Sequence, residues 1–354
     1  MEEQNEFLTL VEQTVERGAS DLFIVAGQKI SCKIGREIVP LGETKAMPDL
    51  TGKLVREAYA LAGRDIARLE TGDDDFAISV PGFARLRMSA YRQRGSLAAV
   101  VRVVSFTIPD YRELHIPETV MRIAHEQKGL VLVSGAAGSG KSTTLACLID
   151  RINHNRAGHI ITIEDPIEYL YRSDKCIISQ RELGTDIGDY AAAVRASLRQ
   201  APDVILLGEL RDAETIRTAI TAAETGHLIF STLHTRGAAS TVERILDAFP
   251  AAQQAQVRLQ LAMQLHAVIS QQLVPTADGT VAPVFEVMHV NPAIRNLIRE
   301  NKLHQIDSVI ATGAAEGMLS MDAGLTELCR QGQITAETAV GCAVHPELMA
   351  KRFK

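Results

Sequence analysis

From residue 130 to residue 232, short uncharged runs alternate with longer segments of helical periodicity. A run of four or five mainly apolar residues predicts a strand that is buried on both faces. Strands of this kind that are separated by helices predict a parallel sheet with helices on both sides. The runs are Leu130–Ser134, Ile160–Ile163, Val204–Leu207 and Leu228–Thr232; helical segments begin at Lys141 or span Tyr190–Arg199 and Ala213–Glu224. The chain is therefore predicted to contain an α/β domain.

The remaining sequence has a different pattern of apolar and polar residues. One helical pattern, Glu6–Arg17, is followed by short β-like runs, which predicts a smaller α+β domain. The end of the chain shows only helical patterns, and there Asn291 suits an N-cap and Pro292 the first helical position. We predict four parts: an α+β domain in residues 1–107, a proline-containing linker in 108–120, the α/β domain in 121–290 and a helical region in 291–354.

The strongest chemical signal is the segment Gly135–Ser142, which matches the pattern G-x-x-x-x-G-K-[ST]. It follows a predicted strand and opens a predicted helix, as a phosphate-binding loop requires. Its glycines let backbone N–H groups turn toward phosphates, Lys141 can reach the β- and γ-phosphates, and the Ser142 hydroxyl can ligate Mg²⁺. The alternative is a glycine-rich turn with an exposed lysine. The residues predicted to bind the nucleotide are Gly135, Ala136, Ala137, Gly138, Ser139, Gly140, Lys141, Ser142 and Thr143.

Two acids follow predicted strands. Glu164 comes just past one apolar run, and Glu209 comes just past another. Because ligands bind at the carboxyl edge of open α/β sheets, both acids are candidates to serve the metal or the attacking water. For either acid alone, a solvated loop carboxylate or a helix cap is the alternative, whereas Asp212 is better explained as a helix N-cap.

Two histidines bracket one predicted strand. His227 and His234 are seven residues apart, so they cannot share one face of a strand and are expected at its two ends. Either histidine alone has an ordinary structural explanation. His234 is the better candidate for sensing the γ-phosphate, because it lies beside the phosphate-side edge.

Five arginines are concentrated between residues 84 and 102, and Arg85 and Arg87 are expected on one strand face. The plain interpretation is a solvated sheet surface. The functional one is that arginines stabilise the charge that develops on a transferring phosphate.

Composition bears on several classes of function. The net charge is −6, Trp is absent and aromatic residues make up 4%, so a protein that mainly binds nucleic-acid phosphates is disfavoured. The five cysteines form no CxxC pair, which suggests neither a zinc site nor a disulfide framework. The acidic start Met-Glu-Glu-Gln-Asn-Glu has no secretory pattern, so a cytoplasmic protein is expected.

Several segments, taken together, resemble the type II/IV secretion ATPase superfamily. They match its phosphate loop, Asp box, second Walker motif and His box in order and spacing, at Gly135–Ser142, Ile163–Pro166, Gly208–Asp212 and Thr225–Thr235. Within that superfamily, Ala293–Glu300 and Gly317–Asp322 resemble the branch that retracts type IV pili. The pilus-assembly branch normally adds a four-cysteine zinc insertion, and its absence here favours the retraction branch.

The resemblance implies a fold and a mechanism. It implies a RecA-like P-loop motor domain with a smaller PAS-like amino-terminal domain, assembled as a homohexamer that binds ATP and Mg²⁺ between the two domains. Glu164 would position or activate water, Glu209 would serve the metal with Ser142, and His227 and His234 would form the His box. Arg87 and Arg102 fall where the family presents arginines to the nucleotide.

The resemblance also implies a partner. The ring would act at the inner face of the cytoplasmic membrane on a platform protein and, through it, on pilin, with only peripheral membrane association. An auxiliary retraction ATPase, or a pilus-assembly or secretion ATPase, is the alternative within the superfamily. A RecA-like nucleic-acid translocase and a non-hydrolysing accessory subunit are the alternatives from other classes.

Overall fold

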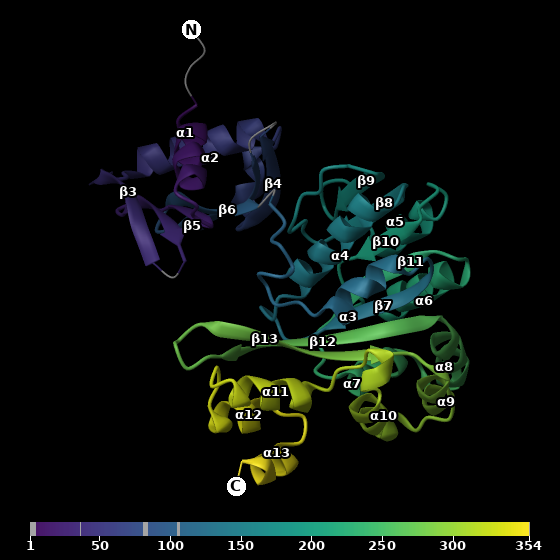
Figure 1. The fold of residues 1–354 in the computed structure, drawn as a ribbon. Coiled ribbons are helices and arrows are strands. Elements are labelled where there is room, and N and C mark those ends of the chain that lie inside the picture. Colours follow the sequence, from purple (N-terminus) through teal and green to yellow (C-terminus); the bar gives the residue numbers. More distant parts are fainter. Residues whose placement is uncertain (1–4, 36, 81–83, 105–106, 354) are drawn as a thin grey trace. The chain divides into compact units, whose positions relative to one another are not determined.

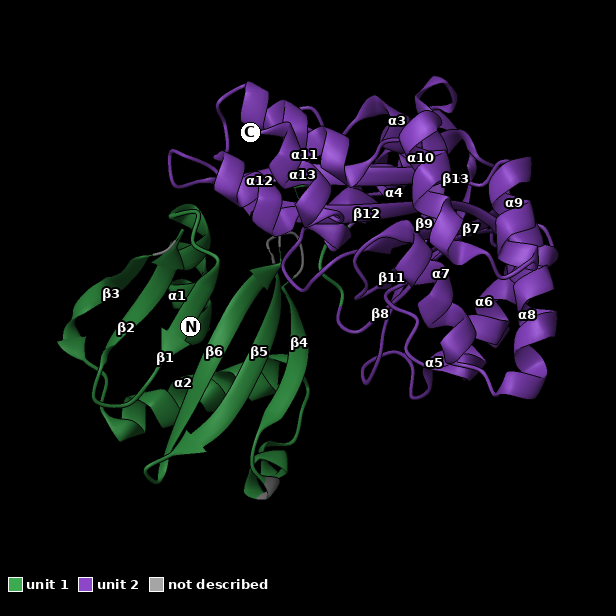
Figure 2. Ribbon diagram, turned by 90° about the horizontal axis from the view of Figure 1, so that it is seen from below, with its two compact units in different colours: residues 1–107, 167–170 green, residues 108–166, 171–354 purple. Residues whose placement is uncertain are grey.

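The computed structural model describes residues 5–35, 37–80, 84–104 and 107–353. Residues 1–4, the larger part of the acidic start, are outside this part of the chain. The structure divides into two compact units, and Figure 2 colours them separately. Unit 1 comprises residues 1–107 and 167–170, and unit 2 comprises residues 108–166 and 171–354.

Unit 1 is built on one antiparallel sheet with the strand order β3-β2-β1-β6-β5-β4. Apolar side chains of its helices, including Phe7, Val11 and Tyr59, pack with those of the strands into one core. This is the α+β unit that the sequence predicts. Its elements are α1 (Glu6–Glu16), β1 (Asp21–Ile24), β2 (Lys29–Ile34), β3 (Glu37–Lys45), α2 (Pro48–Leu61), η1 (Ile66–Thr71), β4 (Asp74–Val80), β5 (Ala84–Gln93) and β6 (Ser96–Val104).

Unit 2 is built on a seven-stranded sheet with the order β13-β12-β7-β11-β10-β8-β9. All neighbouring pairs are parallel except β12 and β13, which form an antiparallel hairpin at one edge. The strands are β7 (Gly129–Ser134), β8 (Gly158–Glu164), β9 (Cys176–Glu182), β10 (Val204–Leu207), β11 (Leu228–Leu233), β12 (Leu265–Pro275) and β13 (Val281–His289). The predicted fold class, an α/β domain and a smaller α+β domain in one chain, is confirmed.

Helices cover both faces of this sheet (Figure 1). Alternate residues of the central strands enter different cores: Leu130 and Leu132 pack against α5 to α10, whereas Val131 and Val133 pack against α3, η2 and α4. This two-sided burial is why the strands read as uninterrupted apolar runs. The helices are α3 (Glu118–Met121), η2 (Arg122–His125), α4 (Lys141–Asn155), α5 (Tyr190–Ser197), α6 (Ala213–Glu224), α7 (Ala238–Asp247), α8 (Ala251–Gln264), α9 (Pro292–Arg299), η3 (Leu303–Gln305) and α10 (Ile306–Thr312).

The end of the chain packs on the outer part of the β12–β13 hairpin. Its elements are η4 (Ala314–Glu316), α11 (Met321–Arg330), α12 (Ala336–Cys342) and α13 (Pro346–Arg352). Val274 and Val284 of the hairpin join Met321, Leu325 and Met349 of these helices in a separate small core. Asn291 caps α9 through its side chain and is followed by proline, as predicted. The sequence patterns did not predict the hairpin itself.

Candidate nucleotide site

The carboxyl ends of four parallel strands bring the predicted residues of unit 2 to one edge of the sheet. The phosphate loop follows β7, Glu164 ends β8, Glu209 comes two residues after β10, and His234 follows β11. The register aligns these ends, because Ser134 pairs with Leu233, Ser231 with Leu207 and Leu207 with Ile163. Candidate phosphate, metal and water ligands therefore meet at a single edge, which is where α/β sheets bind ligands.

The phosphate loop has a shape that only glycine permits at two positions. A Cβ on Gly135 would lie 2.3 Å from the backbone oxygen of Gln271, and a Cβ on Gly140 would lie 2.8 Å from the side-chain nitrogen of Gln271. Gly140 also has a φ of 88°, in the left-handed region, and it is the N-cap of α4. The loop is thus pressed against β12, and its backbone is free to line a concave surface.

Two polar groups of the loop fit a phosphate. The ammonium of Lys141 donates to the carbonyl oxygens of Gly135 and Ala136, both at 2.9 Å, so its charge is held at the mouth of the loop. Within the described residues, the hydroxyl of Ser139 is buried and has no hydrogen-bond partner. A buried polar atom without a partner is costly. Phosphate oxygens would supply the missing partner, so the loop fits a nucleoside triphosphate.

Gln271 is a residue of this site that sequence reasoning missed. It lies on β12, only 4% exposed, and its side-chain oxygen accepts a 2.7 Å hydrogen bond from Thr144 in the first turn of α4. Its backbone and side chain are also the atoms that exclude a Cβ at Gly135 and Gly140. Gln271 therefore fixes the loop and the start of its helix together. A lone glutamine in an uncharged stretch gave no signal of this contact.

Glu164 is held in place from its own and neighbouring strands. Its carboxylate is 8% exposed and accepts hydrogen bonds from Thr162 at 2.6 Å and from Gln180 at 3.4 Å. Tyr190 donates to the carbonyl oxygen of Ile163 at 2.8 Å. Burial is the main reason why the pKa of this phenol is raised. The sequence had placed Glu164 just past the strand, whereas in the structure it is the last residue of β8. Its carboxylate is consequently oriented by rigid strands.

Glu209 lies in a cluster of charged and polar groups. One carboxylate oxygen contacts the guanidinium of Arg211, and the other lies 3.1 Å from Nε2 of His234. Arg211 also approaches Asp165 at 3.4 Å, so it bridges the acids that follow β8 and β10. Sequence reasoning assigned no role to Arg211, because the pairing arises only when two strand ends are aligned.

His234 is neutral near pH 7. Burial, followed by the positive charges of Lys141 and Arg211, lowers its pKa below the ordinary value for histidine. A neutral imidazole whose Nε2–H donates to Glu209 can respond to charge that arrives nearby. The positive charges of Lys141 and Arg211 therefore act on the same edge at which His234 lies.

His227 lies at the other edge of the sheet. It precedes β11, whose first residue pairs with Gly129 at the start of β7. Its ring Nδ1 lies 3.0 Å from the carbonyl oxygen of Ala222 and 3.1 Å from the hydroxyl of Thr225, at the end of α6. At about 3.3 Å per residue, the strand separates the two histidines by roughly 20 Å. Within one chain, the strand does not bring His227 to the phosphate loop.

The two predicted arginines belong to unit 1. Arg87 on β5 and Arg102 on β6 are direct register partners, and both are exposed. Arg102 donates from Nε to Asp21 at 2.9 Å, and Asp21 is itself 5% exposed. The strand pairing thus places the two residues at neighbouring positions on one face of the sheet, and Arg102 is fixed by a buried acid.

A divalent cation would meet only part of its ligand set from the protein. Across the described residues, no three His, Cys, Asp or Glu side chains converge as a metal site. Ser142 in the first turn of α4 and Glu209 beyond β10 offer the oxygen ligands that Mg²⁺ prefers. Mg²⁺ usually keeps several waters and binds phosphate oxygens besides one or two carboxylates. This donor set therefore fits magnesium that arrives with a nucleotide.

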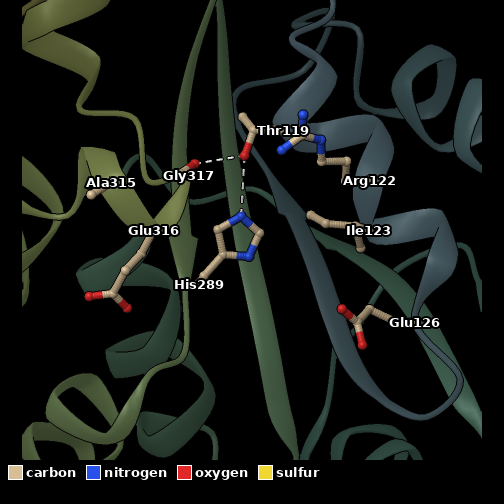
Figure 3. Close-up of a pocket in the computed structure, with 8 residues that line it drawn as sticks. All are labelled: Thr119, Arg122, Ile123, Glu126, His289, Ala315, Glu316 and Gly317. Atoms are coloured by element: carbon tan, nitrogen blue, oxygen red, sulfur yellow. Dashed lines mark hydrogen bonds between the residues drawn. The ribbon is translucent and has the colours of Figure 1, made fainter.

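A cavity of about 310 Å³ lies at the opposite edge of the sheet, between η2 and η4. Figure 3 shows Thr119 bonded to Gly317 and to His289. Its two acids are already paired: Glu126 lies 3.0 Å from His266, and Glu316 accepts from Asn291 at 2.8 Å. Internal bonds thus account for the acids and the histidine of this cavity.

The fold and the loop define the class of the protein, a P-loop nucleotide-binding protein with a largely parallel sheet. Comparison with known proteins places it more closely. The family described as type II/IV secretion system protein matches residues 6–316, and the chain belongs to this family. The predicted resemblance and enzyme class are therefore confirmed.

Individual relatives are similar over nearly the whole chain. The type IV pilus retraction ATPase PilT and the type IV pilus ATPase PilU of Pseudomonas aeruginosa are each 42% identical to it, over 96% of this chain and over 98% and 88% of their own lengths. A crystal structure of the pilus retraction motor PilT with bound ADP superposes with a TM-score of 0.87, at 42% identity, over 96% of this chain and 98% of that one. Within the described residues, no helix is both long and apolar enough to cross a bilayer.

Proposed function

We propose that this chain is a Mg²⁺-dependent ATPase that works as a homohexamer and powers the retraction of type IV pili. The observation that carries the proposal is the meeting of the phosphate loop, Glu164, Glu209 and His234 at one strand edge. Similarity to PilT over almost the full length supports the retraction role. The equal identity to PilU keeps an auxiliary retraction ATPase as the second candidate.

Each residue at the edge has a distinct role in the proposal. The backbone of residues 135–143 cradles the phosphates, and Lys141 transfers its hydrogen bonds from the loop carbonyls to the β- and γ-phosphates. Glu164, held by Thr162 and Gln180, orients the attacking water and accepts its proton. Ser142 and Glu209 hold magnesium, which when bound neutralises charge on the phosphate oxygens.

Two further groups respond to the nucleotide in this proposal. His234 senses the γ-phosphate through its bond to Glu209. Arg87 and Arg102 supply positive charge from unit 1 to the phosphates, either within a chain or across a subunit interface. His227 lies at the other end of β11. It can contribute to the predicted His box only through a contact that is made away from the carboxyl edge.

The source of the arginines can be tested with mixed hexamers. One subunit type carries Lys141→Ala and intact arginines, and the other carries Arg87→Ala and Arg102→Ala with an intact Lys141. Residual ATP hydrolysis in the mixture, above the sum of the two pure variants, indicates arginine supply across an interface. Absence of rescue indicates supply within the chain.

The proposed setting is the inner face of the cytoplasmic membrane, where the ring acts on a platform protein and, through it, on pilin. The test is twitching motility of a strain that lacks its own copy of this protein. The wild-type chain should restore motility, and Glu164→Gln, expressed at the same level, should not. Restored motility with Glu164→Gln, or none with the wild-type chain, would contradict the retraction role.

A further inference from the structure

The start of α7 is capped by side chains from two neighbouring strands. Its N-cap residue is Gly237, which has no side chain that can accept a hydrogen bond. Instead, Gly237 N–H donates to the hydroxyl of Ser270 at 2.9 Å, and Ala238 N–H donates to Oε1 of Glu286 at 2.7 Å. Ser270 and Glu286 are direct register partners on β12 and β13. One cross-strand pair thus satisfies two consecutive amides that a helix start leaves open.

The same carboxylate also faces the start of α11. Ser320, the N-cap of that helix, makes no side-chain capping bond. Val287, the residue after Glu286, exchanges backbone hydrogen bonds with Leu319 at 2.8 and 3.0 Å, which holds the start of α11 against β13. The amide of Met321 accordingly lowers the pKa of Glu286, as the amide of Ala238 does. Both helices pack on the β12–β13 hairpin (Figure 1). A single acid therefore interacts with the amino termini of two helices that are more than 80 residues apart in sequence.

Glu286 is costly to hold where it is. It is 4% exposed, and burial, followed by the nearby charges of Asp307 and Asp322, raises its pKa to about 7. Burying an acid opposes its charged form, and two neighbouring acids add to that cost. The bond from Ala238 offsets part of this cost, so the charge on Glu286 and the start of α7 depend on each other.

The start of α7 is directly connected to the nucleotide edge. Only residues 235–237 separate His234 from α7. This loop is tied to the helix, because the hydroxyl of Thr241 bonds to that of Thr235 at 2.8 Å and donates to the carbonyl oxygen of Gly237 at 2.7 Å. We therefore expect a displacement of His234 to be passed to Ala238 and its bond with Glu286.

We propose that Glu286 is a positioning residue that couples the His234 loop to the C-terminal helices, so that nucleotide binding changes the position and stability of the start of α11. The inference rests on the proposed role of His234 at the γ-phosphate. It assigns α11–α13 as the output of the motor domain, with β13 as the element that carries the signal.

The test is hydrogen–deuterium exchange of the full-length protein, with and without the non-hydrolysable analogue AMP-PNP and magnesium. In the wild-type protein, amides 238–241 and 321–324 should both exchange more slowly when the analogue binds. In Glu286→Gln, which keeps one acceptor and removes the charge, the response of 321–324 should fall at least about fivefold. The analogue should bind within about twofold of wild type, while kcat falls and KM does not.

One control and one further test variant accompany Glu286→Gln. Ser270→Ala removes the bond to Gly237 but keeps Glu286, so it should retain the α11 response. Ala238→Pro removes the amide from the α7 side at the first helical position, where proline is tolerated, so it should also lose the α11 response; it provides the test if Glu286→Gln fails to fold. An unchanged response of 321–324 in both Glu286→Gln and Ala238→Pro, or none in wild type that binds the analogue, would overturn the inference. Failure of wild type to bind the analogue would instead contradict the proposed function.

Discussion

The two edges of the unit 2 sheet carry similar side chains but differ in how these are satisfied. At the carboxyl edge, the hydroxyl of Ser139 is buried without a partner among the described residues, and two glycines exclude a Cβ. At the amino edge, the acids Glu126 and Glu316 are paired within the fold. Arginine, glutamate, histidine and threonine occur at both edges. Residue types alone therefore do not define a site; strand direction and unsatisfied groups do.

The largest difference between the edges is expected for their acids. Glu164→Gln should lower kcat about 10²- to 10⁴-fold, because the amide cannot accept a proton from water. Binding of ATP should be nearly unchanged, since Thr162 can donate to the amide oxygen as it does to the carboxylate. Steady-state phosphate release measures this. Glu126→Gln at the opposite edge is the control and should keep wild-type kcat; equal losses in both would break the comparison.

A second contrast uses glycines. Gly135→Ala should weaken ATP binding by about 100-fold, because the new Cβ meets a backbone oxygen and forces the loop to move. Gly317→Ala is also strained, with φ at 81° and a Cβ 2.8 Å from the Thr119 hydroxyl. It should lower the free energy of unfolding by about 1–3 kcal/mol and leave ATP affinity intact. Calorimetric titration and urea unfolding of both variants test the pair.

A third, smaller effect is expected at Gln271. Replacing it with alanine removes the bond to Thr144 and frees the loop, which should raise KM for ATP about tenfold, the equivalent of one buried hydrogen bond. Glutamate at this position keeps an acceptor but adds charge beside the phosphates and should be worse than alanine. Nucleotide affinities measured for both variants decide the order; a better glutamate variant would contradict it.

A fourth prediction concerns the stability of the fold and its dependence on pH through Glu286. Its folded-state pKa of about 7 lies above its ordinary value of 4.5, chiefly because of burial and then because Asp307 and Asp322 face it, against the opposing amides of Ala238 and Met321. Between these values the folded protein holds a proton that the unfolded chain has lost, so stability falls as pH rises. Glu286→Gln should therefore gain up to about 3 kcal/mol relative to wild type between about pH 5 and pH 8. Urea unfolding at the two pH values checks the sign, and an unchanged difference would contradict it.

Much of the carboxyl edge was predictable from sequence, because it depends on local patterns. An apolar run followed by glycines and lysine predicted the start of α4 at Lys141, and the run before Glu209 predicted its place beyond β10. Asp212 caps α6 through its side chain, also as predicted. In each case the residues that define the feature are close together in the chain.

The rest depends on pairing between distant segments. Gln271 reaches the loop only because β12 pairs with β7, more than 130 residues earlier. The uncharged stretch that contains it gives neither a strand period nor a partner. The spacing of His227 and His234 predicted that they lie at the two ends of one strand, with His234 at the phosphate side, and the parallel register of β11 with β7 confirms this placement. The domain boundaries and the roles of the individual site residues stay predictions.

The most direct test of the account is phosphate release by the purified chain in the presence of magnesium, compared with the Lys141→Ala variant. We expect magnesium-dependent release from the wild-type protein and only background release from the variant, whose thermal stability should be similar. Undiminished release by Lys141→Ala would show that the loop after β7 is not where ATP is split.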